Sequence, residues 1–433
     1  MAIASPNTDT SVASSGTNQS YGAPLATVTT LFFMWGFLTC LNDILVPHLK
    51  SIFDLNYTKV MLIQFAFFGA YFIFSIPSAN VIDWIGYQRS MVAGLLTMGL
   101  GAFLFVPAAS APSYPLFLGA LIVLAAGITC LQVAANPYVT VLGKPETASS
   151  RLNLTQAFNS LGTFLAPFFG GLFILTTAPK MAEIRALSPD ALQAFRLHEA
   201  ATVKMPYVGL GIALVLLAIA IGSFKLPKIE HAQHQIGQKV NDSIWKHPNL
   251  IFGAIAIFVY VGAEVSIGSF LVNYFSQPEI GGLTEKVAAS FVAFYWGGAM
   301  VGRFIGSALL QKMKTGGLLA ICAVCAAGLV TVSMLTTGHF AMYSIILVGF
   351  FNSIMFPSIF TLGIAELGPL TGDGSGVMIM AIVGGAIIPV AQGWIADHLG
   401  IHHAFFLPVI CYLYILFFAV SGSKPNSERY AKV

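Results

Sequence analysis

Charged residues are scarce in this chain. Asp, Glu, Lys and Arg together make up 9% of its 433 residues, whereas hydrophobic residues make up 57%. An average soluble domain has roughly 25% charged residues. The net charge of +3 is small, and we find no cluster of Lys and Arg interleaved with aromatic residues, which argues against a nucleic-acid partner. Most of the surface is therefore expected to face membrane lipid.

Cysteine is also sparse, and it lies only within apolar runs. Cys322 and Cys325 have the spacing of a redox or metal pair, but no His or acidic residue lies near them in the sequence, so we interpret them as small residues of a membrane helix. No HExxH, GxSxG or P-loop motif is present, so we expect neither an enzyme nor a cofactor. Residues 1–23 lack Lys and Arg, show no secretory signal and are expected to form a disordered tail.

Long apolar runs fill the rest of the chain. A helix needs about 20 apolar residues to cross a bilayer, and the sequence predicts twelve such spans: 24–47, 58–82, 89–109, 114–142, 153–177, 205–225, 247–275, 287–310, 316–336, 340–365, 375–396 and 403–422. The predicted fold class is therefore an all-α membrane protein. Ser188 and Pro189 are expected to begin a short surface helix in the longest outer loop.

Lys and Arg set the expected orientation. If the N-terminus lies inside, thirteen of the 20 Lys and Arg residues fall on the cytoplasmic side and seven on the outside. The positive-inside rule then places both termini in the cytoplasm, which for a bacterial protein means the inner membrane. The predicted organisation is an N-tail (1–23), a six-helix bundle (24–225), a cytoplasmic linker (226–246), a second bundle (247–422) and a C-tail (423–433).

Two sequence echoes relate the two sets of six spans. Residues 137–143 of span 4 and 357–363 of span 10 share a Pro, four intervening residues, then Leu-Gly. Residues 162–171 of span 5 and 384–393 of span 11 share the spacing Gly…Pro…Gly. A parallel repeat of six spans is typical of the major facilitator architecture, in which the substrate binds between the halves near the middle of the membrane.

A third echo joins Asp83-Trp-Ile-Gly86 of span 2 and Asp397-His-Leu-Gly400 of span 11. We expect charged residues at cytoplasmic helix ends to form charge clamps that latch the closed-inside state, and assign this gating role to the following residues: Asp83, Arg89, Arg303 and Asp397.

Polar residues within the spans are the candidate functional groups, because a carboxylate at the membrane centre costs about 2.5–3.5 kcal/mol. Asp43 of span 1 must be protonated, bind a cation or face water; the alternative places it at the outer end of the span. Glu264 of span 7 faces either the pathway or a partner helix, and the sequence leaves both open.

Amides suit a sugar, since each hydroxyl both donates and accepts hydrogen bonds. Gln132 and Asn136 share one face of span 4 and Gln156 and Asn159 one face of span 5; helix adhesion is the alternative role for such amides. Further candidates for substrate binding are the following: Gln64, Trp296 and Asn352.

Several runs resemble a known family. LNDILVP, LIQFAFFGAYF, LQVAANPYVTVLG and SRLNLTQAFNSLG resemble the fucose–galactose–glucose symporters of the major facilitator superfamily over residues 25 to 420. This resemblance implies hexose import with protons or sodium by alternating access. It also implies that Asp43 corresponds to the proton-binding acid of the LND motif, and that Gln156 and Asn159 match polar residues of span 5.

The chain departs from the family at two positions. Gln132 stands where the fucose symporter has a Glu, and Cys40 stands where it has an Asn. One carboxylate among oxygen ligands suits a hard monovalent cation, so sodium coupling is favoured over proton coupling. The candidate Na⁺ site is Asp43 with Asn42 and Thr39. We expect a monomer surrounded by lipid.

The rival hypothesis is a drug or metabolite antiporter of the same superfamily. Residues 162–171 differ at Ala166 from the GxxxGPxxGG pattern of facilitator exporters. That pattern serves tight packing and a helix bend, which a symporter also uses. A passive uniporter is a second alternative, and it has no need of Asp43.

Overall fold

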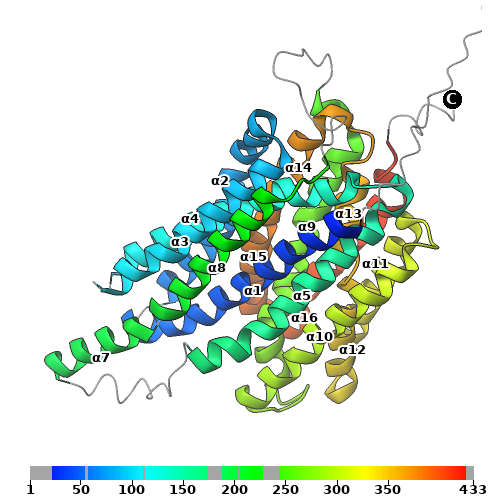
Figure 1. Ribbon diagram of the computed structural model, residues 1–433. Helices are drawn as coiled ribbons and strands as arrows, with labels where there is room; N and C mark the ends of the chain where they lie inside the picture. The colour runs from blue at the N-terminus through cyan, green and yellow to red at the C-terminus, as the bar shows by residue number, and fades with distance from the viewer. Residues whose placement is uncertain are drawn as a thin grey trace, which may run out of the picture.

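A computed structural model describes residues 22–53, 57–110, 113–173, 188–202, 204–227 and 243–425. The parts of the expected tails and linker at 1–21, 228–242 and 426–433 lie outside these ranges. Helices run roughly alongside one another, with α2, α3, α4 and α8 on the left of the view and α10, α11 and α12 on the right (Figure 1).

The first half is a set of long helices. They are α1 (Gly22–Phe53), α2 (Tyr57–Ile85), α3 (Tyr87–Ser110), α4 (Tyr114–Val141), α5 (Ala148–Phe173), α7 (Pro189–Thr202) and α8 (Lys204–Ser223), with a 3₁₀ turn η1 (Pro145–Thr147). Helix α7 is the expected surface helix: it begins at Pro189, and the Ser188 hydroxyl accepts a hydrogen bond from the Ala191 N–H at 3.3 Å.

The second half repeats this pattern with more interruptions. Its elements are η3 (Ile244–Lys246), α9 (Pro248–Phe275), α10 (Glu285–Leu309), α11 (Thr315–Leu335), α12 (Gly338–Asn352), α13 (Met355–Gly363), η4 (Gly368–Leu370), α14 (Thr371–Met380), η5 (Ala381–Val383), α15 (Gly384–Leu399), α16 (Ile401–Ala404), α17 (Phe406–Phe417) and a final π-helical turn η6 (Phe418–Gly422).

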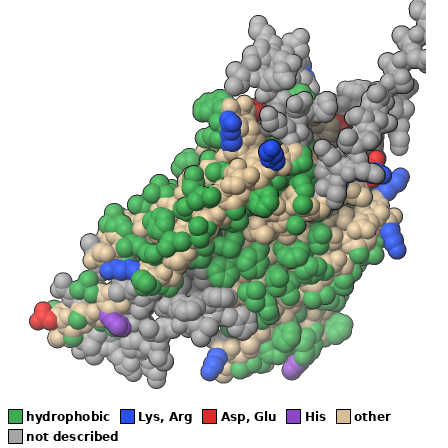
Figure 2. Space-filling view, in the orientation of Figure 1, with side chains coloured by type: hydrophobic (Ala, Val, Ile, Leu, Met, Phe, Trp, Pro, Cys, Tyr) green, Lys and Arg blue, Asp and Glu red, His purple; other side chains and the backbone are tan. Residues whose placement is uncertain are grey.

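Ten helical segments in the described part of the chain are long and apolar enough to cross a membrane. Helices α1 and α5 occupy the two remaining predicted spans, so the all-helical prediction is confirmed. Span 10 is split into α12 and α13, and span 11 consists of η4, α14, η5 and α15. Figure 2 shows hydrophobic side chains covering most of the visible flank, with Lys and Arg towards its ends, as expected of a surface that faces lipid.

The two halves repeat one close helix contact. A side-chain carbon added at Gly162 of α5 would overlap the Phe33 carbonyl of α1. One added at Gly384, at the start of α15, would overlap the Phe258 carbonyl of α9. These glycines belong to the echo between spans 5 and 11, and each lets its helix touch the first helix of its own half. The echo therefore reflects a structural repeat, in keeping with two pseudo-symmetric bundles.

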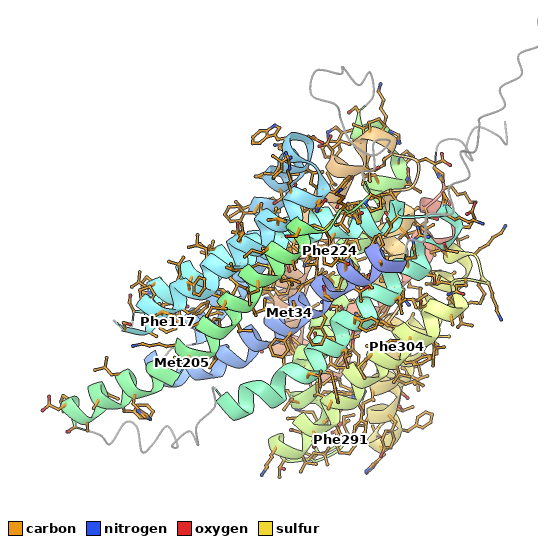
Figure 3. The ribbon with its side chains drawn as sticks, in the orientation of Figure 1. Met34, Phe117, Met205, Phe224, Phe291 and Phe304 are labelled. Atoms are coloured by element: carbon orange, nitrogen blue, oxygen red, sulfur yellow. The ribbon has the colours of Figure 1, made fainter. Side chains whose placement is uncertain are left out.

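The halves are joined by hydrogen bonds near one end of the bundle, which carries Gly86 and Lys312 and which we call the Gly86 end. The Ser149 and Thr361 hydroxyls lie 2.6 Å apart, and the Ser150 hydroxyl donates to the Ser307 carbonyl at 2.7 Å. Beside them, the ring of Phe304 (Figure 3) lies 6.1 Å from that of Phe158. This end is closed by direct contact between α5 and the second half.

The third sequence echo has a local cause. Gly86 links α2 to α3 with φ 82°, and Gly400 links α15 to α16 with φ 84°. This left-handed conformation favours glycine, so Asp-x-x-Gly marks two helix ends. The expectation that both lie at the cytoplasmic end was wrong. Asp83 lies beside Gly372, near the start of span 11. Asp397 lies 25 residues after Gly372 in the same span. At a rise of about 1.5 Å per residue it is therefore roughly 37 Å from Gly372, towards the opposite end of the bundle.

Candidate substrate and ion site

Buried amides on α4 are the first part of the site. The Gln132 side-chain N–H donates to the Tyr71 hydroxyl of α2 at 2.7 Å, while its Oε1 has no hydrogen-bond partner among the described residues. Asn136, one turn further, is fully buried, and neither of its amide atoms has such a partner. A buried polar group without a partner costs about 1–3 kcal/mol. A ligand with hydroxyl groups is one kind of partner that would satisfy these atoms.

Helix α5 carries two of the predicted amides, one with an unpartnered atom and one that is hydrogen-bonded to α1. Gln156 is buried and its Nε2 lacks a partner within the described structure. Asn159 instead donates to the Phe32 carbonyl of α1 at 3.0 Å, and its own carbonyl packs against Gly36. The geometry thus ties the Asn159 amide to helix adhesion, the alternative weighed for these residues. Gln156 keeps the polarity expected of a ligand-binding group.

The expected cation site lies just past the middle of α1, at residues 39–43. The backbone of Thr39, Asn42 and Asp43 belongs to that helix, but their side chains lie outside the described structure, as does that of Gln64 on α2. Helix α1 packs along α5, which places the backbone of the predicted cation ligands on a neighbour of the helix that carries Gln156.

The second half contributes an amide and an aromatic ring. The Asn352 side-chain N–H donates to the Tyr295 hydroxyl at 2.9 Å, and its Oδ1 has no partner in the described part of the chain. The neighbouring Trp296 is 41% exposed and packs against Gly268 of α9. An indole that is partly open beside a buried amide suits a ligand with both an apolar face and hydroxyls.

Glu264 of α9 is held by a tyrosine. The Tyr260 hydroxyl donates to Glu264 Oε1 at 2.8 Å and also lies 3.1 Å from the Asn352 carbonyl oxygen. Glu264 is partly exposed by its accessible surface. Glu264 therefore bonds within its own helix and remains partly accessible. Whether it faces the pathway or a partner helix stays a prediction.

Arg303 of α10 connects this region to the first half. Its Nε donates to the Ser353 carbonyl at 3.3 Å, and its Nη1 donates to the Ser160 hydroxyl of α5. The Asn153 side-chain N–H in turn donates to the Arg303 carbonyl at 2.6 Å. Arg303 therefore joins the two halves, through neutral oxygen atoms in these contacts.

The other predicted clamp residues do not all lie at one end of the bundle. Asp83 lies at the Gly86 end next to the start of α14, Arg89 is exposed on α3, and Asp397 lies towards the opposite end. The structure does not bring the four residues into one clamp. Serine and threonine hydroxyls of α5, α10 and α13 join the halves at this end instead. These contacts could not be predicted from the sequence, because serine is common in membrane helices.

Gln392 of α15 is a further candidate that sequence reasoning missed. It is fully buried, and neither amide atom has a partner among the described residues. Like Gln132, it is an amide within an apolar span. Unlike Gln132, it has no second amide at helical spacing, and this is why it was missed.

An apolar groove lies elsewhere, between α1, α5 and α8, where Figure 3 shows Met34. Its lining includes Leu154, Leu216 and two threonines whose hydroxyls already donate to carbonyls of α1. Such a lining offers little to a polar substrate, so the groove does not compete with the amide site.

Comparisons with known proteins place the whole chain in a family. The sequence profile of the Major Facilitator Superfamily matches residues 26–382. A glucose/galactose transporter of Brucella abortus is 52% identical over 98% of this chain and 100% of its own length. The L-fucose-proton symporter of Escherichia coli is 36% identical over 93% of this chain and 94% of its own.

Solved structures show the same likeness. A crystal structure of the E. coli fucose:proton symporter, FucP, has a TM-score of 0.87 and 34% identity, and covers 94% of this chain and 100% of its own. A FucP structure in the outward conformation has the same TM-score and identity, and covers 93% of this chain and 99% of its own.

Proposed function

Since the chain belongs to the fucose–galactose–glucose symporter family of the Major Facilitator Superfamily, and so is a sugar transporter and not an enzyme, we propose that it imports a hexose of the glucose or galactose class together with a cation. The observation that carries the proposal is a set of buried amide atoms in both halves that have no partner among the described residues; they belong to Gln132, Asn136, Gln156 and Asn352. Hydroxyls of a sugar would satisfy both their donors and their acceptors.

The amides come from both halves of the chain. Gln132, Asn136 and Gln156 belong to the first half, and Asn352 and Trp296 to the second. A substrate bound between them would feel any movement of one half against the other, as alternating access requires. One relative is named for glucose and galactose and the other for L-fucose, and both names support a hexose.

We assign the coupling cation to Asp43, with Asn42 and Thr39 as further oxygen ligands. Sodium is favoured because Gln132 leaves one carboxylate in this part of the first half, and a proton is the alternative. The fucose relatives are named as proton symporters, so the choice of ion is for experiment to decide.

The closed Gly86 end supports an outward-facing state. We place this end in the cytoplasm, because Lys144, Lys225 and Lys312 belong to it under the positive-inside count. Sugar would then enter from the opposite side, as in the outward conformation of the FucP structure. Both termini would be cytoplasmic, and one chain in the inner membrane would contain the whole pathway.

The antiporter hypothesis has lost its main support. The glycine pattern at residues 162–171 is explained by packing, since Gly162 admits the Phe33 carbonyl of α1. The buried amides of Gln132, Asn136 and Gln156 suit the hydroxyl groups of a sugar better than an apolar drug.

The test is counterflow in proteoliposomes. Vesicles loaded with unlabelled glucose or galactose should take up the labelled sugar transiently, and Asn136→Ala should reduce the apparent affinity. Asn249→Ala is the matched control, because the Asn249 amide donates to the carbonyls of Gly363 and Ala365 at 3.1 and 3.0 Å and so serves the fold. Absence of counterflow with every hexose tried would favour the antiporter.

A further inference from the structure

Tyr260 and Arg303 meet neighbouring carbonyls at the break in span 10. The Tyr260 hydroxyl reaches the Asn352 carbonyl at 3.1 Å, and Arg303 Nε donates to the Ser353 carbonyl at 3.3 Å. In a continuous helix the Ser353 carbonyl would accept from the N–H of residue 357, but that residue is Pro357 and has none. The proline therefore leaves this carbonyl available to Arg303.

Hydrogen bonds on either side of one peptide unit connect Glu264 to the first half. The path runs from the Glu264 carboxylate through Tyr260 to the backbone at Asn352 and Ser353, then through Arg303 to the Ser160 hydroxyl in the other half. Arg303 also acts electrostatically on Glu264. The partly exposed carboxylate of Glu264 is thus connected to the Arg303 guanidinium, which holds the two halves together.

The local chemistry suits a proton at Glu264 better than a metal cation. The Tyr260 hydroxyl has a single proton and two acceptors, Glu264 Oε1 and the Asn352 carbonyl. When Glu264 is ionised, Tyr260 can donate to it. When Glu264 is protonated, the carboxyl O–H can donate to the Tyr260 oxygen and the tyrosine proton can turn to the Asn352 carbonyl. Both states are satisfied, whereas a sodium ion there would be repelled by Arg303.

We propose that Glu264 is a second ion-binding group, a proton site in the second half, whose protonation loosens the contact that Arg303 makes across the halves. The inference rests on the proposed alternating-access function and holds whichever cation occupies Asp43. Ionised Glu264 balances the Arg303 charge and stabilises the closed Gly86 end. Protonation removes this counter-charge and favours opening of that end.

Glu264 is the one carboxyl group among the residues of this cluster. The charged and titratable groups that act on it are Tyr260 of its own helix, Arg303 and Tyr295 of α10, and Tyr412 of α17. Free phenols titrate near pH 10, and guanidinium groups stay charged. Asp373 and Asp397 are the acids of span 11. They lie near its two opposite ends, whereas Glu264 lies within α9, away from both ends of that helix.

The test measures the Gly86 end without sugar. Spin labels at Lys225→Cys and Lys312→Cys, both exposed, in a background without the five native cysteines, report the separation of the halves in nanodiscs. Lowering the pH from about 8 to about 5 should raise the ratio of open to closed molecules. We expect an increase of about 5- to 150-fold, the range typical of coupled sites. Glu264→Gln should resemble the low-pH state at every pH.

Further variants separate this role from a folding defect. Glu264→Asp should keep a pH response. Tyr260→Phe should keep one with a displaced midpoint. The control is Glu279→Gln, which changes an exposed acid beyond α9 and should behave as the parent. A parent-like pH response in Glu264→Gln, or a parent with no pH response, would overturn the proposal. Because no sugar is present, failure of hexose counterflow would overturn the proposed function and leave this result interpretable.

Discussion

The Ser375 hydroxyl of α14 donates a hydrogen bond to the Val133 carbonyl of α4 at 2.8 Å. That carbonyl is available because residue 137, four positions on, is a proline without an N–H. In the second half, Pro357 likewise frees the Ser353 carbonyl for Arg303. The proline that the two halves share in sequence therefore supplies, in each half, an acceptor used where the halves meet.

We expect Ser375→Ala to loosen the closed Gly86 end. Loss of one hydrogen bond is worth about 0.5–1.5 kcal/mol, so the open-to-closed ratio should rise roughly two- to twelvefold, measured with the label pair at positions 225 and 312. Ser344→Ala is the control, because that hydroxyl bonds to the Phe340 carbonyl of its own helix. An unchanged ratio in Ser375→Ala would show that the bond does not help to close this end.

Pro137→Ala should act on the same bond. The new N–H would compete with Ser375 for the Val133 carbonyl, so the single changes should each favour opening. Their effects should not add, because residues that share a partner are coupled. A double-mutant cycle on the same distance measurement checks this, and strict additivity would contradict it.

The two repeated glycines should be intolerant of a side chain. Gly162→Ala and Gly384→Ala force α5 and α15 away from carbonyls of α1 and α9, and overpacking of this kind costs about 1–3 kcal/mol. We expect a lower midpoint of thermal unfolding in detergent. Gly119→Ala and Gly328→Ala, where nothing lies within 4 Å of the added carbon, should leave it unchanged or raise it slightly. Equal effects in all four variants would refute the packing explanation.

Two buried asparagines should separate binding from stability. Asn136→Ala should weaken hexose binding about two- to twelvefold, as expected for one hydrogen bond, with little loss of stability, since its amide atoms bond to no described residue. Asn249→Ala should lower stability and leave affinity unchanged, because its amide N–H groups bond to backbone carbonyls. Binding isotherms and thermal unfolding of both variants give the comparison; a reversal of the two effects would contradict the assignment.

The spans, the surface helix and the repeat could be predicted from the sequence. Apolar runs indicate the spans, Ser188 and Pro189 indicate the surface helix, and repeated Gly and Pro residues indicate the repeat. The break at residues 353–354 was not, since an apolar pattern reads the same through a kinked span. Asp397 was assigned to the cytoplasmic end from a four-residue echo, although an odd-numbered span must end on the other side. Arg303 was identified as a clamp residue, but its partners in the structure are neutral oxygens of Ser160 and Ser353, which only tertiary contact reveals.

The most direct test of cation-driven hexose import is uptake of labelled glucose and galactose into proteoliposomes under an inward sodium gradient or an inward proton gradient, each at fixed membrane potential. One positive charge per sugar gains about 2.3 kcal/mol per 100 mV, enough for roughly fifty-fold accumulation. We predict accumulation driven by sodium that Asp43→Asn abolishes while counterflow persists. Accumulation driven by protons alone would contradict sodium coupling, and accumulation that survives Asp43→Asn would contradict the cation site.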